Sequence, residues 1–121
     1  MEKKEYFIIR TNNMEHGMTF EIVYPKDIER LRMEKRAIIV DIRSRDEYAQ
    51  GHWEGAINYP EEKISDYTKV LGKKRPIILY CGHGGASMQV ARTLGKNGYE
   101  VGSVVGGFDA MKKYISSLKK D

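Results

Sequence analysis

Short apolar runs alternate with amphipathic stretches along most of this chain. The runs are rich in β-branched and aromatic residues, which favours strands, and they cover residues 20–24, 37–41, 76–80 and 99–105. Apolar positions recur at helical spacing in four further stretches, at residues 25–31, where Pro25 suits a first helical position, 61–71, 87–97 and 108–118. Alternating strands and helices predict an α/β fold, with an open, mainly parallel sheet flanked by helices on both faces.

Local signals define several of these elements more closely. Residues 76–80 form the most apolar run, which predicts the centre of the sheet. Ser44 and Glu47 match a capping box, so a short helix is expected from Ser44 to about Gly51. Residues 55–60 indicate a turn that leads into a short strand. The last helix is expected to bury Met111, Tyr114, Ile115 and Leu118.

The first 19 residues stand outside this alternation. Residues 6–9 are apolar, and turn-prone residues between 12 and 17 separate them from the apolar segment at 19–23. We expect the two apolar segments to pair as an extra N-terminal β-hairpin. The predicted organisation is therefore an N-terminal extension at 1–19 followed by one domain at 20–121.

Length and composition exclude several classes of protein. A chain of 121 residues with 40% hydrophobic residues suits one compact domain, and no apolar run approaches the roughly 18 residues of a membrane span. The single cysteine excludes an internal disulfide and a zinc site built on several thiols, so we expect a cytoplasmic protein with no metal or other cofactor. The net charge of +4 arises from both signs mixed along the chain, which predicts neither a nucleic-acid partner nor a membrane partner.

The candidate chemistry lies in the loop from Cys81 to Ser87, between a buried strand and a helix start. Ligands of open α/β sheets bind at this position, beyond the carboxyl ends of the strands. Three of the loop residues are glycines, which allow successive backbone amides to turn towards one point. Amide donors and the helix N-terminus favour the thiolate, the reactive form of cysteine. Cys81 is therefore expected to be a nucleophile, and His83 to tune substrate preference rather than transfer protons.

A segment before this loop carries a multipoint match to a known family. Residues 41–60 contain Asp-x-Arg, Glu-Tyr and Gly-His-x-x-Gly-Ala-x-Asn-x-Pro in that order, which closely resembles the first signature of the rhodanese family. The loop pattern Cys-x-x-Gly-x-x-Ser is similar to that of small one-domain sulfurtransferases, and residues 106–108 resemble the family's closing Gly-Gly segment without its tryptophan. The resemblance covers roughly residues 20–118 and implies a rhodanese-like parallel sheet flanked by helices.

The resemblance also implies an activity and assigns roles to residues. It implies that Cys81 takes sulfane sulfur from a small anionic donor, thiosulfate or a persulfide, and passes it to cyanide or a thiol, including a protein thiol. The implied substrate-binding loop consists of Gly82, His83, Gly84, Gly85, Ala86 and Ser87. The implied supporting scaffold consists of Asp41, Arg43, Glu47 and His52. Because the loop has no arginine or lysine to hold an anionic donor, we expect weak turnover of thiosulfate.

Two other functions stay open at this point. A non-enzymatic sulfur-relay or regulatory module of the same family would also retain Cys81. A cysteine phosphatase or arsenate reductase on a related fold needs an arginine six residues after the cysteine to clamp a tetrahedral dianion. Position 87 is a serine, which disfavours this second alternative.

Overall fold

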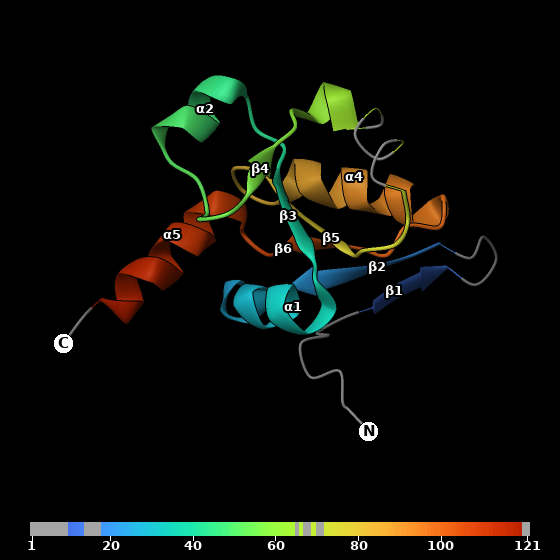
Figure 1. Cartoon of the computed structure of the whole chain (residues 1–121), viewed down its shortest axis with the longest axis horizontal. Helices are drawn as coiled ribbons and strands as arrows, with labels where there is room; N and C mark the ends of the chain where they lie inside the picture. Colours follow the sequence, from blue (N-terminus) through green and yellow to red (C-terminus); the bar gives the residue numbers. More distant parts are fainter. Residues whose placement is uncertain (1–9, 14–17, 65, 67–68, 70–71, 120–121) are drawn as a thin grey trace.

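The computed structural model describes residues 10–13, 18–64, 66, 69 and 72–119. Six strands form one sheet in the order β1-β2-β6-β5-β3-β4 (Figure 1). The first pair is antiparallel, and all other neighbours are parallel. The strands are β1 (Arg10–Asn13), β2 (Met18–Val23), β3 (Ile38–Asp41), β4 (Ile57–Asn58), β5 (Ile77–Tyr80) and β6 (Val101–Val104). The predicted α/β fold with a mainly parallel sheet is confirmed.

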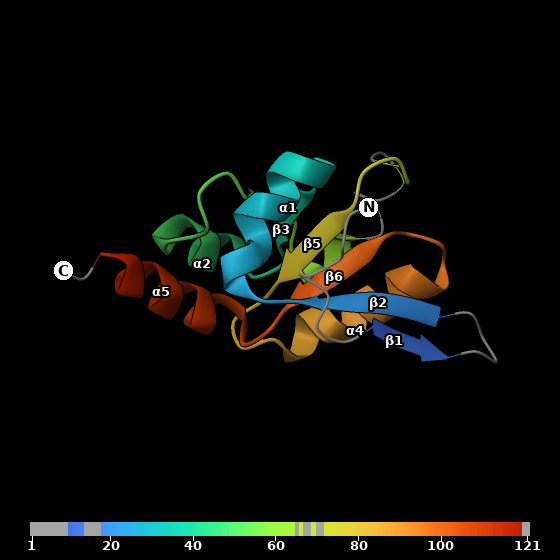
Figure 2. The ribbon, with the colours of Figure 1, turned by 90° about the horizontal axis from the view of Figure 1, so that it is seen from below.

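Helices cover both faces of this sheet. The α-helices are α1 (Ile28–Lys35), α2 (Arg45–Gln50), α4 (Gly85–Lys96) and α5 (Gly107–Leu118), and the 3-10 helices are η1 (Pro25–Asp27) and η2 (Glu61–Lys63). Figure 2 shows α1 and α4 on opposite sides of the strands. No helix in the described part of the chain is long and apolar enough to cross a membrane.

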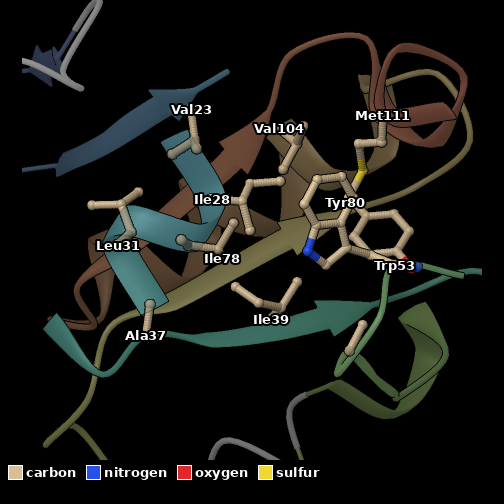
Figure 3. Close-up of a cluster of buried hydrophobic side chains, with 11 residues drawn as sticks. Val23, Ile28, Leu31, Ala37, Ile39, Trp53, Ile78, Tyr80, Val104 and Met111 are labelled. Atoms are coloured by element: carbon tan, nitrogen blue, oxygen red, sulfur yellow. The ribbon is translucent and has the colours of Figure 1, made fainter. Parts of the chain in front are cut away.

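Strand alternation divides the interior into two cores. Along β5, Ile78 and Tyr80 point to the face covered by α1 and α5, whereas Ile77, Leu79 and Cys81 point to the face covered by α4. Figure 3 shows the first core, in which Trp53 and Tyr80 share a cluster with Ile28 and Leu31 of α1 and Met111 of α5. All four residues of β5 are buried, as expected for the predicted central strand.

Parallel pairing brings several loops to the same edge of the sheet. β3 ends at Asp41, β5 at Tyr80 and β6 at Val104, and their carboxyl ends lie at one edge because β5 pairs in parallel with both neighbours. Both α4 and α5 begin directly beyond this edge. The fold therefore gathers two helix N-termini around the residue that follows β5, which is Cys81.

The capping-box prediction is confirmed at α2. The Ser44 side chain accepts a hydrogen bond from the Glu47 amide, the Glu47 side chain reaches back to the Ser44 amide, and the helix ends before Gly51. The short strand expected after the turn at 55–60 is β4. Both signals are local in sequence, which explains why the prediction succeeds.

Other boundaries differ from prediction. Pro25 opens the 3-10 turn η1, and α1 starts three residues later. Leu118 is 64% exposed rather than buried, because α5 extends past the sheet, while Met111 is fully buried. A hairpin forms between β1 and β2, but its first strand is Arg10–Asn13, so Asn12 and Asn13 belong to a strand rather than to the predicted turn. Residues 6–9, predicted as its first strand, lie outside the described residues.

The predicted helix at 61–71 is described only in part. It opens with η2, and Ile64, Asp66 and Lys69 are helical, while residues 65, 67–68 and 70–71 lie outside the described residues. Ile64 is buried in the core on the α4 side, as its predicted inward position requires.

Candidate active site

Cys81 lies at the junction of β5 and α4, and two backbone amides donate hydrogen bonds to its sulfur. The amide of Gly84 donates to Sγ at 3.1 Å, and the amide of Ser87 donates at 3.3 Å. The Ser87 hydroxyl lies 3.4 Å from the same sulfur. The cysteine is free and only 7% exposed, so these donors act in a largely water-free site where their interaction with charge is strong.

The start of α4 explains why the amides point at the sulfur. The first amides of a helix have no partner within the helix, and a side-chain acceptor usually caps them. Gly84, the N-cap residue, provides no side-chain cap, and Sγ takes that place at Ser87, the third residue of α4. Gly84 has φ 108°, and a Cβ atom there would lie 3.2 Å from the Gly106 amide nitrogen, so glycine is required for this turn.

The start of α5 holds the backbone of the same loop. The amide of Phe108 donates to the Cys81 carbonyl at 2.7 Å, and the amide of Asp109 donates to the Gly82 carbonyl at 3.2 Å. This approach requires a glycine at 107, where φ is 61° and a Cβ atom would lie 2.5 Å from the Cys81 carbonyl oxygen. The sequence predicted only a tight turn at 106–107, so this contact with the candidate nucleophile was missed.

The six predicted loop residues differ in what they contribute. Gly84 and Ser87 contact Sγ through their amides, whereas Ala86 packs against the core on the α4 side. A Cβ atom at Gly82 or Gly85 would meet no other atom within 4 Å, so the space beside these two residues is open. The His83 side chain is 85% exposed, and its Nδ1 lies 2.7 Å from Oδ2 of Asp109.

Of the four predicted scaffold residues, Asp41 and Arg43 form a buried ion pair beside the site. Arg43 donates through Nε and Nη2 to the fully buried Asp41 carboxylate, and its Nη2 also donates to the Gly51 carbonyl at 2.7 Å. Burial opposes the charge on Arg43, but the contacts with Asp41 outweigh it and raise the pKa of the guanidinium. The guanidinium lies 4.2 Å from the ring centre of Phe108, the residue whose amide binds Cys81.

Glu47 and His52 act farther from the sulfur. Glu47 closes the capping box of α2. His52 Nδ1 lies 2.8 Å from the Tyr48 carbonyl oxygen, and its ring stacks on the Tyr48 ring at 3.7 Å. Neither has a contact with Cys81 among the described residues. Their contacts instead stabilise α2 and the segment that follows it.

Two buried hydroxyl groups, those of Tyr80 and Ser103, form hydrogen bonds on opposite faces of the sheet. Tyr80 accepts a hydrogen bond from the Trp53 amide, and burial raises its pKa, so the phenol stays neutral. On the opposite face, the Ser103 hydroxyl of β6 lies 2.7 Å from that of Ser87. Sequence reasoning missed Ser103, although a single serine within the run at 99–105 predicted as a strand was an available signal.

Comparison with known proteins identifies relatives along most of the chain. A family model described as the rhodanese-like domain matches residues 24–114. A protein named thiosulfate sulfurtransferase GlpE from Coxiella burnetii is 32% identical over 100 residues, which cover 82% of this chain and 85% of the relative. A GlpE protein of Haemophilus influenzae is 36% identical over 93 residues, covering 76% of this chain and 88% of the relative.

Solved structures give the same result for the fold. The rhodanese homolog of Thermus thermophilus superposes with a TM-score of 0.58 at 32% identity, over 74% of this chain and 99% of that chain. Reduced CoADR-RHD of Bacillus anthracis superposes with a TM-score of 0.72 at 28% identity; the match covers 81% of this chain but only 17% of that much longer one. The chain therefore belongs to the rhodanese-like domain family.

Proposed function

We propose that this protein is a sulfurtransferase in which Cys81 carries the transferred sulfur as a persulfide. The observation that carries the proposal is the convergence of the Gly84 and Ser87 amides on Sγ. Such donors stabilise negative charge on sulfur, both in the attacking thiolate and in the persulfide anion. The name of the relatives, thiosulfate sulfurtransferase, supports the same chemistry.

In the first half-reaction, the Cys81 thiolate attacks the outer sulfur of the donor. A new S–S bond forms to Sγ while the donor's own bond to that sulfur breaks. The electron pair of the broken bond leaves with sulfite when the donor is thiosulfate, or with a thiolate when the donor is a persulfide. No external oxidant is needed, because the transferred sulfur already has the oxidation state of a persulfide.

In the second half-reaction, a thiolate or cyanide attacks the terminal sulfur. The bond to Sγ breaks, and its electron pair returns to Cys81 as the thiolate, which the Gly84 and Ser87 amides again stabilise. The product is a persulfide or thiocyanate. Although Cys81 is only 7% exposed, the acceptor needs to reach only the terminal sulfur, about 2 Å beyond Sγ.

The identity of the donor depends on how the loop binds an anion. His83 is the loop's only side chain that can become cationic, and the Asp109 carboxylate lies 2.7 Å from its ring. The nearby Asp109 carboxylate thus reduces the net positive charge that a protonated His83 would offer to thiosulfate. We therefore propose that both thiosulfate and persulfides serve as donors, with persulfides the better substrates.

We also propose domain boundaries and a cellular location for this protein. The sulfurtransferase domain would comprise residues 20–121 and the extension residues 1–19, a division supported by the start of the family match at residue 24. A reducing compartment such as the cytoplasm suits a protein whose single cysteine must stay free.

Mass spectrometry tests the proposed function directly. Incubation with thiosulfate, or with a low-molecular-weight persulfide, should add one sulfur atom to Cys81, and later addition of cyanide should remove it as thiocyanate. The Cys81→Ser variant should gain no sulfur and should lose turnover entirely, because serine cannot form a persulfide. If the wild-type protein gains no sulfur from either donor, the proposal is wrong. Formation of the persulfide without turnover would instead favour the sulfur-relay alternative.

A further inference from the structure

A pair of buried hydroxyl groups lies behind the candidate nucleophile. Ser87 is fully buried and Ser103 is 1% exposed, and their oxygens are 2.7 Å apart. Strand alternation explains the contact: Val104 of β6 faces α1 and α5, so the preceding residue, Ser103, faces α4. Ser103 therefore reaches the first turn of α4 from the neighbouring strand, on the side where Cys81 also points.

Counting protons assigns a direction to this hydrogen bond. Within the part of the chain that the structure describes, the Ser87 oxygen is the one partner of the Ser103 hydroxyl. A buried O–H without an acceptor is costly, so Ser103 donates its proton to Ser87. The single proton of Ser87 is then left for its two other neighbours, the Gly84 carbonyl at 3.3 Å and Sγ of Cys81 at 3.4 Å.

The two charge states of Cys81 use this proton differently. When the sulfur is a thiol, its proton can point to Ser87 while Ser87 donates to the Gly84 carbonyl. When the sulfur is an anion, the Ser87 hydroxyl can rotate to donate to it, as a third donor beside the two amides. The Gly84 carbonyl is not orphaned by this rotation, because it also accepts from the Met88 amide at 3.2 Å.

We propose that Ser103 is a positioning residue that donates to Ser87 and thereby directs the Ser87 hydroxyl to the sulfur anion of Cys81. By occupying one lone pair of the Ser87 oxygen, Ser103 limits its rotation and polarises its O–H bond. The proposal deepens the proposed function, since the persulfide anion would use the same donor. It needs only a reactive thiolate at Cys81, however, and can be tested without any sulfur donor.

Charged groups around the site are the same in all the variants needed for the test. α5 contributes Asp109, which pairs with His83 of the loop. The end of β3 and the residues that follow it contribute the Asp41–Arg43 pair, which reaches the loop through Phe108. Substituting a serine leaves these charges in place. A change in the pH dependence of the Cys81 alkylation rate would therefore report the loss of a hydroxyl group.

The test measures the rate at which a small alkylating reagent modifies Cys81 between pH 6 and pH 9. At pH 7, Ser87→Ala should slow the reaction about tenfold, as expected for loss of a hydrogen bond to a charged group. Ser103→Ala should slow it about two- to threefold, because it weakens that bond indirectly. Both deficits should shrink as the pH rises and the thiol ionises regardless. In the Ser87→Ala background, Ser103→Ala should have no further effect.

Controls make each outcome decisive. Thr93→Ala removes an exposed hydroxyl on α4 and should leave the Cys81 alkylation rate at the wild-type value. Ser103→Thr keeps the hydroxyl and should retain most of the wild-type rate. Urea unfolding verifies that every variant is folded. The proposal is overturned if Ser103→Ala matches the wild type, if its effect persists without the Ser87 hydroxyl, or if Ser103→Thr is as slow as Ser103→Ala. If alkylation behaves as expected but no sulfur is transferred, the proposed function fails and the role of Ser103 stands.

Discussion

The two segments that carry the recognisable motifs use their polar groups in opposite ways. In the sulfur loop, residues 81–87, two amides and a hydroxyl converge on the sulfur of Cys81. In the 41–58 segment, polar side chains bind carbonyls of the same segment: Arg43 binds Gly51, Asn58 binds Asp41 and Arg43, and Tyr48 binds Ala56. The first segment therefore directs its donors to a single sulfur atom, whereas these donors of the second bind its own backbone.

This difference shows that the segment with the most family-defining residues need not be the one that contacts the candidate nucleophile. The 41–58 segment supplies most of the positions that define the family resemblance, yet its polar contacts stabilise the conformation of the segment itself. It contacts the candidate site through Phe108, since Arg43 lies over the Phe108 ring and the Phe108 amide binds the Cys81 carbonyl. Substitutions in the segment should therefore reduce stability first, and those in the sulfur loop should reduce reactivity first.

Asp41→Asn should have the largest effect on stability and tests whether the 41–58 segment affects stability rather than reactivity. Arg43 would keep its charge in a site where its side chain is 9% exposed but would lose its anionic partner. Breaking a buried ion pair from one side costs about 3 kcal/mol, which should lower the free energy of unfolding measured in urea. The alkylation rate of Cys81 in the folded variant should stay within about twofold of the wild type. A large loss of reactivity with unchanged stability would show that the two segments do not differ as described.

Gly107→Ala tests the start of α5, which links the two segments through Phe108. A Cβ atom at 107 would lie 2.5 Å from the Cys81 carbonyl and 2.6 Å from the Gly82 carbonyl, so α5 or the sulfur loop must shift. We expect a loss of about 2 kcal/mol in unfolding free energy together with slower sulfur transfer, because the Cys81 backbone moves.

Gly72→Ala is the matched control for this substitution. Gly72 also has a positive φ, 76°, but a Cβ atom there would meet nothing within 4 Å. It should carry only the conformational cost of a left-handed residue, about 1 kcal/mol, with no change in transfer. Equal effects of the two substitutions on transfer would remove the steric explanation for Gly107.

Sequence analysis succeeded where the signal and its partner lie close together in the chain. The capping box of Ser44 and Glu47 and the glycine turn after Cys81 can be recognised within a few residues. The role of β5 as the central strand followed from its continuous apolar run. These features fixed the fold class and the nucleophile candidate before any tertiary contact was considered.

Contacts that depend on packing between distant residues could not be predicted in this way. Ser103 meets Ser87 only because β6 pairs with β5, and Gly107 meets Cys81 only because α5 begins beside the loop. Leu118 matched the helical stripe of α5, but periodicity cannot tell where a helix extends past the sheet. Pattern analysis finds the face of an element and not the neighbour that covers it.

The smallest expected effect concerns the contact between the 41–58 segment and α1. Trp53 Nε1 donates to Oε2 of Glu29 at 2.7 Å, and Arg32 Nη2 donates to the same oxygen. Burial opposes ionisation of Glu29, but the hydrogen bonds from Arg32 and Trp53 outweigh it and lower its pKa below the ordinary 4.5. A lowered pKa adds stability above the unfolded-state value, and this contribution is lost as the pH falls through the folded-state value.

Glu29→Gln should therefore destabilise the protein at pH 7, and the difference from the wild type should shrink as the pH falls below 4.5. Because the Glu29 side chain is 58% exposed, solvent screening limits the loss to about 0.5 kcal/mol. Urea unfolding followed by the fluorescence of Trp53, the only tryptophan, measures it, with the exposed Glu34→Gln on the same helix as control. Cys81 alkylation should not change in either variant. A Glu29→Gln deficit that persists at low pH would show that the carboxylate charge is not what joins α1 to this segment.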